Sequence, residues 1–417
     1  MTTTLIQQVR VLDPVSQTDQ IADVLIEAGV LQAIASQLPS SESAEVIDGR
    51  GKLFAPGLVD LYSHSGEPGF ESRETLSSLQ QAAAAGGFTR VGLLPTTQPV
   101  ADNPAAIAQL KTPGLFPWGA LTVAAQGQQM SDLVELAAAD VVGFTDNRPL
   151  DHWLLLRRLL EYAQPLQKPI ALWPCSQTLT GGAAREGIDA LRLGLPGIPA
   201  IAETTALAAL LECVAATGTP VHIMRVSTAR SVALIAQAKA ARFPITASTT
   251  WMHLLFSTAD LATYDPNLRL DPPLGTPADQ QALIEGVQTG TIDAIAVDHT
   301  PYTYEEKTVP FALAPPGVIG LELVLPILWQ RFVASGQWSA LQLWASLSQQ
   351  PANCLTQAPP TLAVDQPLEA ILFEPQVAWA VTEKRLKSLS ANTPWLGQTL
   401  NGRVLQNWSG LGRQAGI

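Results

Sequence analysis

Polar side chains that could take part in hydrolytic or metal chemistry gather in one short stretch of the chain. Residues 60–69 read Asp-Leu-Tyr-Ser-His-Ser-Gly-Glu-Pro-Gly and follow the apolar residues 54–59. This pattern predicts a short buried strand that ends in a turn, with polar side chains at its carboxyl end. In an α/β barrel the catalytic residues lie at this end of the strands, so His64 is the first candidate for a site.

Histidine, the side chain that most often binds metals in proteins, is scarce in this sequence. The chain contains five, namely His64, His152, His222, His253 and His299. That small number limits any metal site before its geometry is considered. His152 stands at the start of a predicted surface helix, and we assign it no role.

The composition indicates a folded protein with a large core. Hydrophobic residues make up 47% of the 417 residues, charged residues make up 14%, and the formal net charge is −12. The negative charge argues against nucleic acid and anionic membranes as partners. No apolar run approaches the roughly 20 residues that cross a bilayer, and no signal-peptide pattern is present. The cysteines Cys175, Cys213 and Cys354 have no paired spacing, which suits a cytoplasmic protein.

From residue 57 onward, apolar runs rich in β-branched residues alternate with helical patterns. Eight runs predict strands, over residues 58–63, 89–94, 120–124, 141–144, 169–173, 220–226, 244–249 and 292–297. Helices are predicted over residues 73–85, 229–241, 279–288, 318–333 and 339–348. Eight βα units in about 300 residues indicate an α/β protein with a (β/α)8 barrel like that of triosephosphate isomerase. A doubly wound open sheet is the alternative.

Short alternating strands precede and follow this region. They are predicted over residues 5–12, 22–28, 30–34 and 45–48, with Gly29 as a hairpin turn, and again over residues 370–373 and 379–381. We expect the two chain ends to form one small β-sandwich domain. The predicted β domain therefore comprises residues 1–54 and 363–417, and the predicted barrel comprises residues 55–362.

Several short motifs occur in the order in which one enzyme family carries them. They are Pro-Gly-Leu-Val-Asp at 56–60, Glu-Pro-Gly at 67–69, Gly-Gly-Phe-Thr at 86–89, Gly-Leu-Pro-Gly-Ile-Pro at 194–199, Val-Ser-Thr-Ala at 226–229, Asp-His-Thr-Pro at 298–301, Gly-Leu-Glu at 320–322 and Asn-Thr-Pro at 392–394. Each motif is weak alone, but together they run through the whole chain. The sequence resembles the bacterial-type dihydroorotases, which are cyclic amidohydrolases of the amidohydrolase superfamily.

The resemblance implies a metal site at the mouth of the barrel. In the family one or two zinc ions activate a water molecule, and an aspartate after the eighth strand moves the proton. The ligand positions of the family fall on Tyr62, His64, Asp146, Trp173, Arg225 and Asp298. His64, Asp146 and Asp298 keep ligand-type side chains, and Asp298 occupies the proton-shuttle position.

The other three positions carry side chains that are unsuited to zinc. Trp173 offers only a donor N–H, Arg225 brings a permanent positive charge, and Tyr62 could bind only as a phenolate. We therefore expect no bound metal and no other cofactor. Without a metal, Asp146 and Asp298 would be buried charges, so we predict that Arg225 pairs with one of them.

The remaining histidines do not supply the missing ligands. His222 lies three residues before Arg225 on the same predicted strand, so the two side chains should point to opposite faces. We interpret His253 and His299 as structural residues.

The positions that bind dihydroorotate in the family are also changed, including Gly66 and Thr96, which correspond to the residues that hold its carboxylate. They fall on Gly66, Thr96, Asp271, Tyr302 and Gly317, of which Gly317 alone keeps the family residue. An anionic carboxylate that leaves water needs a charge-assisted partner, and Gly66 replaces the arginine of the family. Dihydroorotate is therefore expected to bind poorly. A change of specificity, as in hydantoinases, would explain Gly66 but not Trp173 or Arg225.

The sequence therefore predicts a dihydroorotase-like protein of pyrimidine biosynthesis that has lost its catalytic activity. The resemblance implies a structural partnership with aspartate transcarbamoylase, with which members of the family associate. The alternative is an active cyclic-amide hydrolase with a single zinc ion at His64, Asp146 and Asp298, acting on dihydroorotate or another substrate. A small-molecule sensor is a third alternative, and association into a homo-oligomer stays open.

Overall fold

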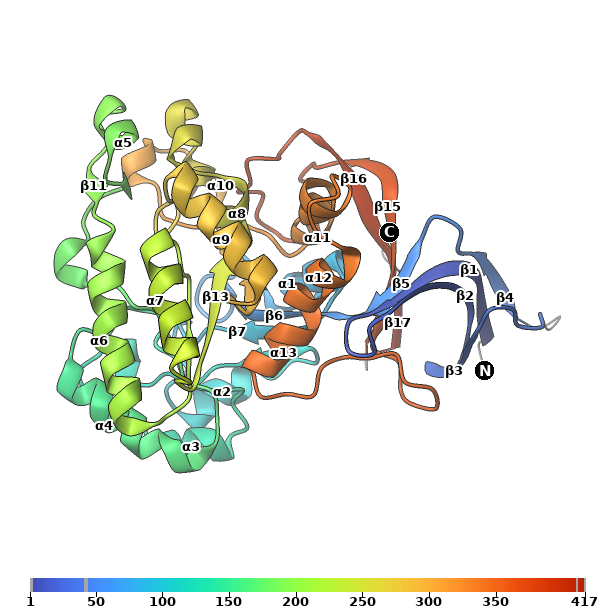
Figure 1. Cartoon of the computed structure of the whole chain (residues 1–417), viewed down its shortest axis with the longest axis horizontal. Helices are drawn as coiled ribbons and strands as arrows, with labels where there is room; N and C mark the ends of the chain where they lie inside the picture. The colour runs from blue at the N-terminus through green and yellow to red at the C-terminus, as the bar shows by residue number, and fades with distance from the viewer. Residues whose placement is uncertain (1–2, 41–43, 410–411, 416–417) are drawn as a thin grey trace.

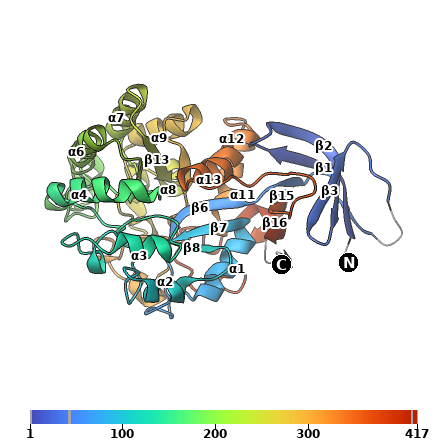
Figure 2. The same cartoon turned by 90° about the horizontal axis from the view of Figure 1, so that it is seen from below.

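The computed structural model describes residues 3–40, 44–409 and 412–415. Figure 1 shows a body of helices and strands on one side and a twisted sheet, which holds both chain ends, on the other. The view from below in Figure 2 shows the same separation, with the first strands of the chain furthest from the helical body. The described chain contains no helix that is long and apolar enough to cross a membrane.

The sheet at the chain ends contains eight strands. Seven of them follow the order β17 (Gly412–Ala415), β16 (Thr399–Ser409), β15 (Ala370–Ala380), β5 (Leu53–Pro56), β1 (Thr3–Asp13), β2 (Thr18–Glu27) and β3 (Val30–Ala35), and β4 (Glu45–Asp48) pairs with β1. β15 runs antiparallel to β5, with Ala370 opposite Pro56, so both chain ends share one sheet. Ile6, Val24 and Phe54 are fully or almost fully buried in its core.

The predicted β-sandwich is not found among the described residues. The ladders join the strands of both chain ends into a single sheet, because β15 pairs directly with β5 instead of packing face to face against it. The predicted boundary at residue 54 falls inside β5.

The body of the molecule is built on parallel strands. One sheet contains β6 (Leu58–Ser63), β7 (Phe88–Leu93) and β8 (Leu115–Pro117), and another contains β9 (Ala171–Leu172), β12 (Val221–Ile223), β13 (Ile245–Thr250) and β14 (Ala294–Ala296). Single parallel bridges from Phe144 to Gly119 and to Ile170 connect them on one side. On the other side the Val297 N–H donates to the Asp60 carboxylate at 2.8 Å. A small separate pair is formed by β10 (Ala184–Arg185) and β11 (Gly197–Ile198).

Two of the eight predicted strands differ in the structure. The third strand lies at residues 115–117, and the predicted run 120–124 leads instead into the 3-10 turn η1 (Val123–Ala125). Ala124 and Ala125 both have a φ of 52°, which an extended strand cannot contain, although their small apolar side chains resemble those of a strand. The fourth predicted strand, 141–144, takes part only through the bridges of Phe144.

Helices connect and cover these strands (Figure 1). They are α1 (Leu76–Gly86), α2 (Pro104–Leu110), α3 (Leu133–Ala138), α4 (Trp153–Ala163), α5 (Ile188–Arg192), α6 (Ile201–Thr217), α7 (Ala229–Ala240), α8 (Trp251–Leu255), α9 (Pro277–Thr289), α10 (Tyr304–Lys307), α11 (Val324–Leu328), α12 (Ala340–Trp344) and α13 (Gln350–Cys354). Gly87, with a φ of 89°, ends α1 in the left-handed conformation that favours glycine.

The helix predicted over residues 318–333 begins only at Val324. α11 continues as the π-helical turn η7 (Trp329–Val333), and α12 continues as a second one, η8 (Ala345–Gln349). Residues 318–323 are not helical, because Val318 forms a parallel bridge with His299 at the end of the last parallel strand.

Candidate active-site cavity

A cavity of about 330 Å³ lies at the carboxyl ends of the parallel strands. Its lining includes His64, Asn147, Trp173, Arg225, Asp271, Asp298, Tyr302 and Gly317. Most of these residues directly follow a strand or one of the isolated bridges, which is the position that the sequence predicted for the site.

Arg225 and Asp298 form a bidentate ion pair in this cavity. Nε of Arg225 donates to Oδ2 of Asp298 at 2.7 Å, and Nη2 donates to Oδ1 at 2.6 Å. The Arg225 side chain is 5% exposed and that of Asp298 is 15% exposed. The guanidinium also lies 5.1 Å from the centroid of the Trp173 ring and 5.5 Å from that of Tyr62. The predicted ion pair is confirmed, and it involves Asp298.

Both partners of the ion pair have an unusual backbone conformation, and the contact keeps Arg225 charged. The φ angles of Arg225 and Asp298 are 54° and 51°, a strained region for residues other than glycine that requires support from the surroundings. Burial alone would lower the pKa of Arg225, but the Asp298 carboxylate raises it above its usual value. Arg225 is therefore a fixed cation in the wall of the cavity.

A chain of hydrogen bonds lies beneath the ion pair. The Arg225 N–H donates to the Tyr62 hydroxyl at 3.2 Å, and that hydroxyl lies 2.9 Å from Oγ of Ser248. Ser248 is in turn 2.9 Å from Nε2 of His222, whose Nδ1 contacts Thr246 at the same distance. Burial raises the pKa of Tyr62, so it is a neutral phenol and not the phenolate that a metal would need. Burial lowers the pKa of His222 to about 3, so this histidine is neutral.

His64 reaches the cavity but is held by two weak contacts. Its Nδ1 lies 3.3 Å from Oγ1 of Thr96, and its Nε2 lies 3.4 Å from Nδ2 of Asn147. Burial lowers the pKa of His64 to about 4, so the ring is neutral. Thr96, which the family resemblance placed in the substrate site, contacts His64 instead of lining the cavity.

The structure does not bring Asp146 to the other candidate ligands. Its carboxylate accepts hydrogen bonds from the Thr122 N–H at 2.9 Å and from the Thr122 hydroxyl at 2.6 Å. The neighbouring Asn147, with a left-handed φ of 55°, lines the cavity in its place. The turn therefore directs one residue of the pair into the cavity and the other into the protein.

The residues of this site do not fit a zinc ion. Within the described ranges there is no group of three or more histidine, cysteine, aspartate or glutamate side chains that could hold a metal. The oxygens of Asp298 accept from Arg225, those of Asp146 accept from Thr122, and the ring nitrogens of His64 contact Thr96 and Asn147.

The positions that the family resemblance placed in the substrate site leave little space for side chains at Gly66 and Gly317 and add an acidic residue at Asp271. A Cβ atom at Gly66 would lie 2.3 Å from the Phe70 carbonyl oxygen and 2.4 Å from that of Glu74, so no larger side chain fits without a shift of the backbone. Gly317 has a φ of 134°, and a Cβ atom there would lie 2.5 Å from Cβ of Thr300. Asp271 lines the cavity, and burial raises its pKa.

His253 also lines the cavity. Its Nδ1 lies 2.7 Å from Oγ1 of Thr250 and its Nε2 lies 3.2 Å from the Pro272 carbonyl oxygen. His152 begins α4, as the sequence indicated, and accepts a hydrogen bond from the Leu155 N–H.

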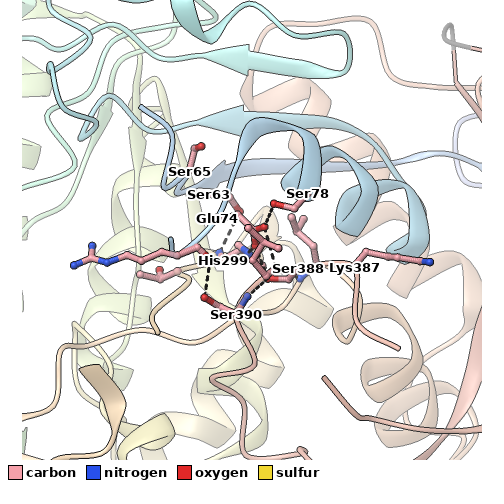
Figure 3. Close-up of polar contacts among 12 residues, drawn as sticks. Ser63, Ser65, Glu74, Ser78, His299, Lys387, Ser388 and Ser390 are labelled. Atoms are coloured by element: carbon pink, nitrogen blue, oxygen red, sulfur yellow. Dashed lines mark hydrogen bonds and ion pairs between the residues drawn. The ribbon is translucent and has the colours of Figure 1, made fainter. Parts of the chain in front are cut away.

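His299 belongs to a different cluster, which Figure 3 shows. Its Nδ1 accepts from the Gly320 N–H at 3.1 Å, so Nε2 carries the proton and donates to Glu74 at 3.3 Å. Glu74 also accepts from the hydroxyls of Ser78 and Ser388 and from the Leu389 N–H. A serine, a histidine and a carboxylate thus meet, but both Ser388 and His299 donate to the carboxylate, so the histidine cannot act as a base for the serine.

Glu74 belongs to no motif that would mark it in the sequence. It stands beside Arg73 just before the first helical turn, where acidic residues are common for reasons of helix polarity. Only the contacts from residues 299 and 388–389 distinguish it, and these residues are far away in the sequence.

Comparison with known proteins agrees with this architecture. Residues 51–231 match the family model described as Dihydro-orotase-like. The chain is 43% identical to a probable dihydroorotase-like protein of Synechocystis sp., over 95% of this chain and 98% of that protein. It is 37% identical to a dihydroorotase of Pelotomaculum thermopropionicum, over 95% of each chain.

Solved structures show the same fold at lower identity. The L-hydantoinase of Arthrobacter aurescens superimposes with a TM-score of 0.83 at 20% identity, over 98% of this chain and 94% of that one. The dihydropyrimidinase of Brevibacillus agri gives a TM-score of 0.81 at 22% identity, over 98% and 94% of the two chains. The sequence relatives and this shared fold establish that the chain belongs to the dihydroorotase-like family of amidohydrolases.

Proposed function

We propose that this chain is a dihydroorotase-like protein that does not hydrolyse dihydroorotate and serves as a structural partner of aspartate transcarbamoylase in the cytoplasm. The loss of hydrolytic activity is inferred from the ion pair between Arg225 and Asp298. A general base must be directed at the water molecule that it activates, whereas both oxygens of Asp298 are directed at one guanidinium.

The environment of the ion pair supports the same conclusion. The cation of Arg225 repels a dication, and neither Tyr62 nor Trp173 offers a lone pair that would bind zinc in its present state. Gly66 leaves no space for a side chain that could grip the substrate carboxylate. The partnership with aspartate transcarbamoylase rests on the family resemblance alone.

We also propose that the two parallel sheets form a single closed barrel of eight strands. The bridges of Phe144 connect the sheets on one side, and the contact between Val297 and Asp60 connects them on the other. Closure of this kind would place the carboxyl ends of all strands around the cavity.

Metal analysis combined with a turnover assay tests the loss of activity. We expect the protein purified from zinc-supplemented cells to contain much less than one zinc ion per chain and to show no hydrolysis or synthesis of dihydroorotate. Stoichiometric zinc together with measurable turnover would show instead that the chain is an active hydrolase with a reduced metal site.

A variant with restored zinc ligands is the matched control for the metal analysis. Combined Tyr62→His, Trp173→His and Arg225→His restores histidine at the changed positions and removes the cation, so it should bind more zinc than the wild type.

Co-purification of the wild-type chain with aspartate transcarbamoylase tests the partnership separately. Absence of a complex at micromolar concentrations would exclude it without affecting the first half of the proposal.

A further inference from the structure

A groove of about 990 Å³ lies outside the cavity, on the other side of Tyr302. One wall is α10 with the loop that follows it, up to Pro310, and the opposite wall is the segment 389–396 from the C-terminal part of the chain. Tyr302 lines both spaces and separates them.

Large apolar side chains are exposed along this groove. Tyr304 is 75% exposed, Leu389 is 58% exposed and Leu396 is 43% exposed. Single exposed apolar residues are common on proteins, but several that face one concave surface are typical of a binding site. The groove therefore has a surface that would be stabilised by contact with an apolar partner.

The charges of the groove are acidic. Asp265, Glu305 and Glu383 line it, and the side chains of the two glutamates make no hydrogen bond or ion pair within the described chain. Lys307 does not neutralise them, because it is buried and its Nζ donates to the carbonyls of Pro266, Pro315 and Gly317 at 2.8 to 2.9 Å. A partner with positive charges next to its apolar groups would be complementary.

The wall that carries Leu389 is held rigidly. Figure 3 shows Ser388 beside Glu74 and His299, with Ser390 close to them. Ser388 and the Leu389 N–H donate to Glu74, and the Ser390 hydroxyl donates to the Arg73 carbonyl at 2.7 Å. A wall that is fixed before binding reduces the entropy cost of association.

We propose that this groove binds an extended segment of a partner protein that carries apolar side chains flanked by lysine or arginine. Tyr304, Leu389 and Leu396 would hold the apolar side chains, and Glu305 and Glu383 would pair with the basic ones. The inference deepens the structural-partner half of the proposed function and rests on it, whereas it is independent of the loss of catalytic activity.

Binding of synthetic peptides to the full-length chain tests the proposal. The probe is a fluorescein-labelled ten-residue peptide with alternate leucines flanked by lysines, and the matched control peptide has glutamate in place of every lysine. We expect saturable binding of the basic peptide, measured by fluorescence anisotropy, with an affinity that falls as salt is added. The acidic peptide should bind at least about tenfold more weakly.

Substitutions test whether the peptide binds in the groove. Tyr304→Ser, Leu389→Ser and Glu305→Lys should each weaken binding of the basic peptide by about tenfold or more. Leu191→Ser, at an apolar residue of α5 that is 79% exposed and lies outside the groove, should leave the affinity unchanged.

Three outcomes would overturn the proposal. The basic peptide could fail to bind, Leu191→Ser could weaken binding as much as the groove variants, or the acidic peptide could bind equally well. Analytical ultracentrifugation of the chain alone could also overturn it. A dimer that Leu389→Ser dissociates would show that the groove binds a second copy of this chain. The absence of a complex with aspartate transcarbamoylase, in contrast, would not affect the peptide-binding result. It would exclude only aspartate transcarbamoylase as the partner.

Discussion

The cavity at the strand ends and the groove beside α10 share Tyr302 as a wall, but their charged groups are arranged in opposite ways. In the cavity Arg225 and Asp298 form an ion pair, the histidines are neutral, and burial raises the pKa of Asp271, the other carboxyl group that lines it. In the groove Glu305 and Glu383 have no cationic partner among the described residues, and apolar side chains are exposed beside them. Internally paired charges gain little from a ligand, whereas unpaired charges next to apolar surface gain from contact with a partner.

The largest effect is expected when the cavity loses its internal pairing. Arg225→Met leaves the Asp298 carboxylate buried without its cation, which should lower the free energy of unfolding by about 3–5 kcal/mol. Urea denaturation followed by circular dichroism measures this loss. The double variant with Arg225→Met and Asp298→Leu should recover most of it, because neither charge then remains. A single variant as stable as the wild type would mean that water, not Arg225, satisfies Asp298.

The ion pair could be predicted from sequence because each partner stands next to a motif. Asp298 begins Asp-His-Thr-Pro, and Arg225 precedes Val-Ser-Thr-Ala, so both could be placed at strand ends that meet in space. A buried carboxylate close to a fixed cation is then the expected arrangement. Most of the predicted strands and helices could be predicted for a similar reason, because the spacing of their apolar residues and the glycines that end the helices are local signals.

Features set by backbone rotation or by distant segments were not predictable. The left-handed φ of Asn147 decides that Asn147 and not Asp146 faces the cavity, and although asparagine adopts this angle more readily than most residues, the sequence alone does not place it there. The run 120–124 has the composition of a strand but bends at Ala124. The groove joins α10 to residues 389–396, and neither segment has a periodic pattern that would indicate its partner.

A smaller effect is expected from loosening the wall of the groove. Glu74→Gln places an amide donor against groups that already donate, namely Ser388, the Leu389 N–H and His299, and should cost about 2 kcal/mol of stability. Hydrogen exchange at the Leu389 amide should become faster. Glu71→Gln is the control, since Glu71 is exposed and its carboxylate accepts from the Gly69 N–H, away from the cluster. Unchanged exchange at Leu389 would show that the wall is rigid without this cluster.

The hydrogen bonds beneath the cavity should make the protein sensitive to acid. Burial lowers the pKa of His222 to about 3 from an ordinary value of 6.5, so between these values only the unfolded chain binds a proton there. Stability should therefore fall as the pH falls through this window, with this residue contributing up to about 1.4 kcal/mol for each pH unit.

Substitution of the histidine isolates its share of the acid sensitivity. His222→Gln should flatten the dependence measured by urea denaturation at a series of pH values from about 7 to 5. Equal slopes for the wild type and His222→Gln would indicate that His222 is accessible to protons in the folded state.

The smallest effect concerns the carboxylate that the cavity does not use. Thr122→Val removes the hydroxyl that donates to Asp146 and accepts from the Gly127 N–H but keeps the bond from the Thr122 N–H, so stability should fall by about 1–2 kcal/mol. Zinc content should stay as low as in the wild type, because Asp146 remains directed into the protein and Arg225 remains in the cavity. Metal analysis of this variant beside Thr122→Ser, which keeps the hydroxyl, checks both statements. Zinc uptake by Thr122→Val alone would mean that one hydroxyl keeps Asp146 from acting as a ligand, and the cavity would then be closer to a metal site than its ion pair indicates.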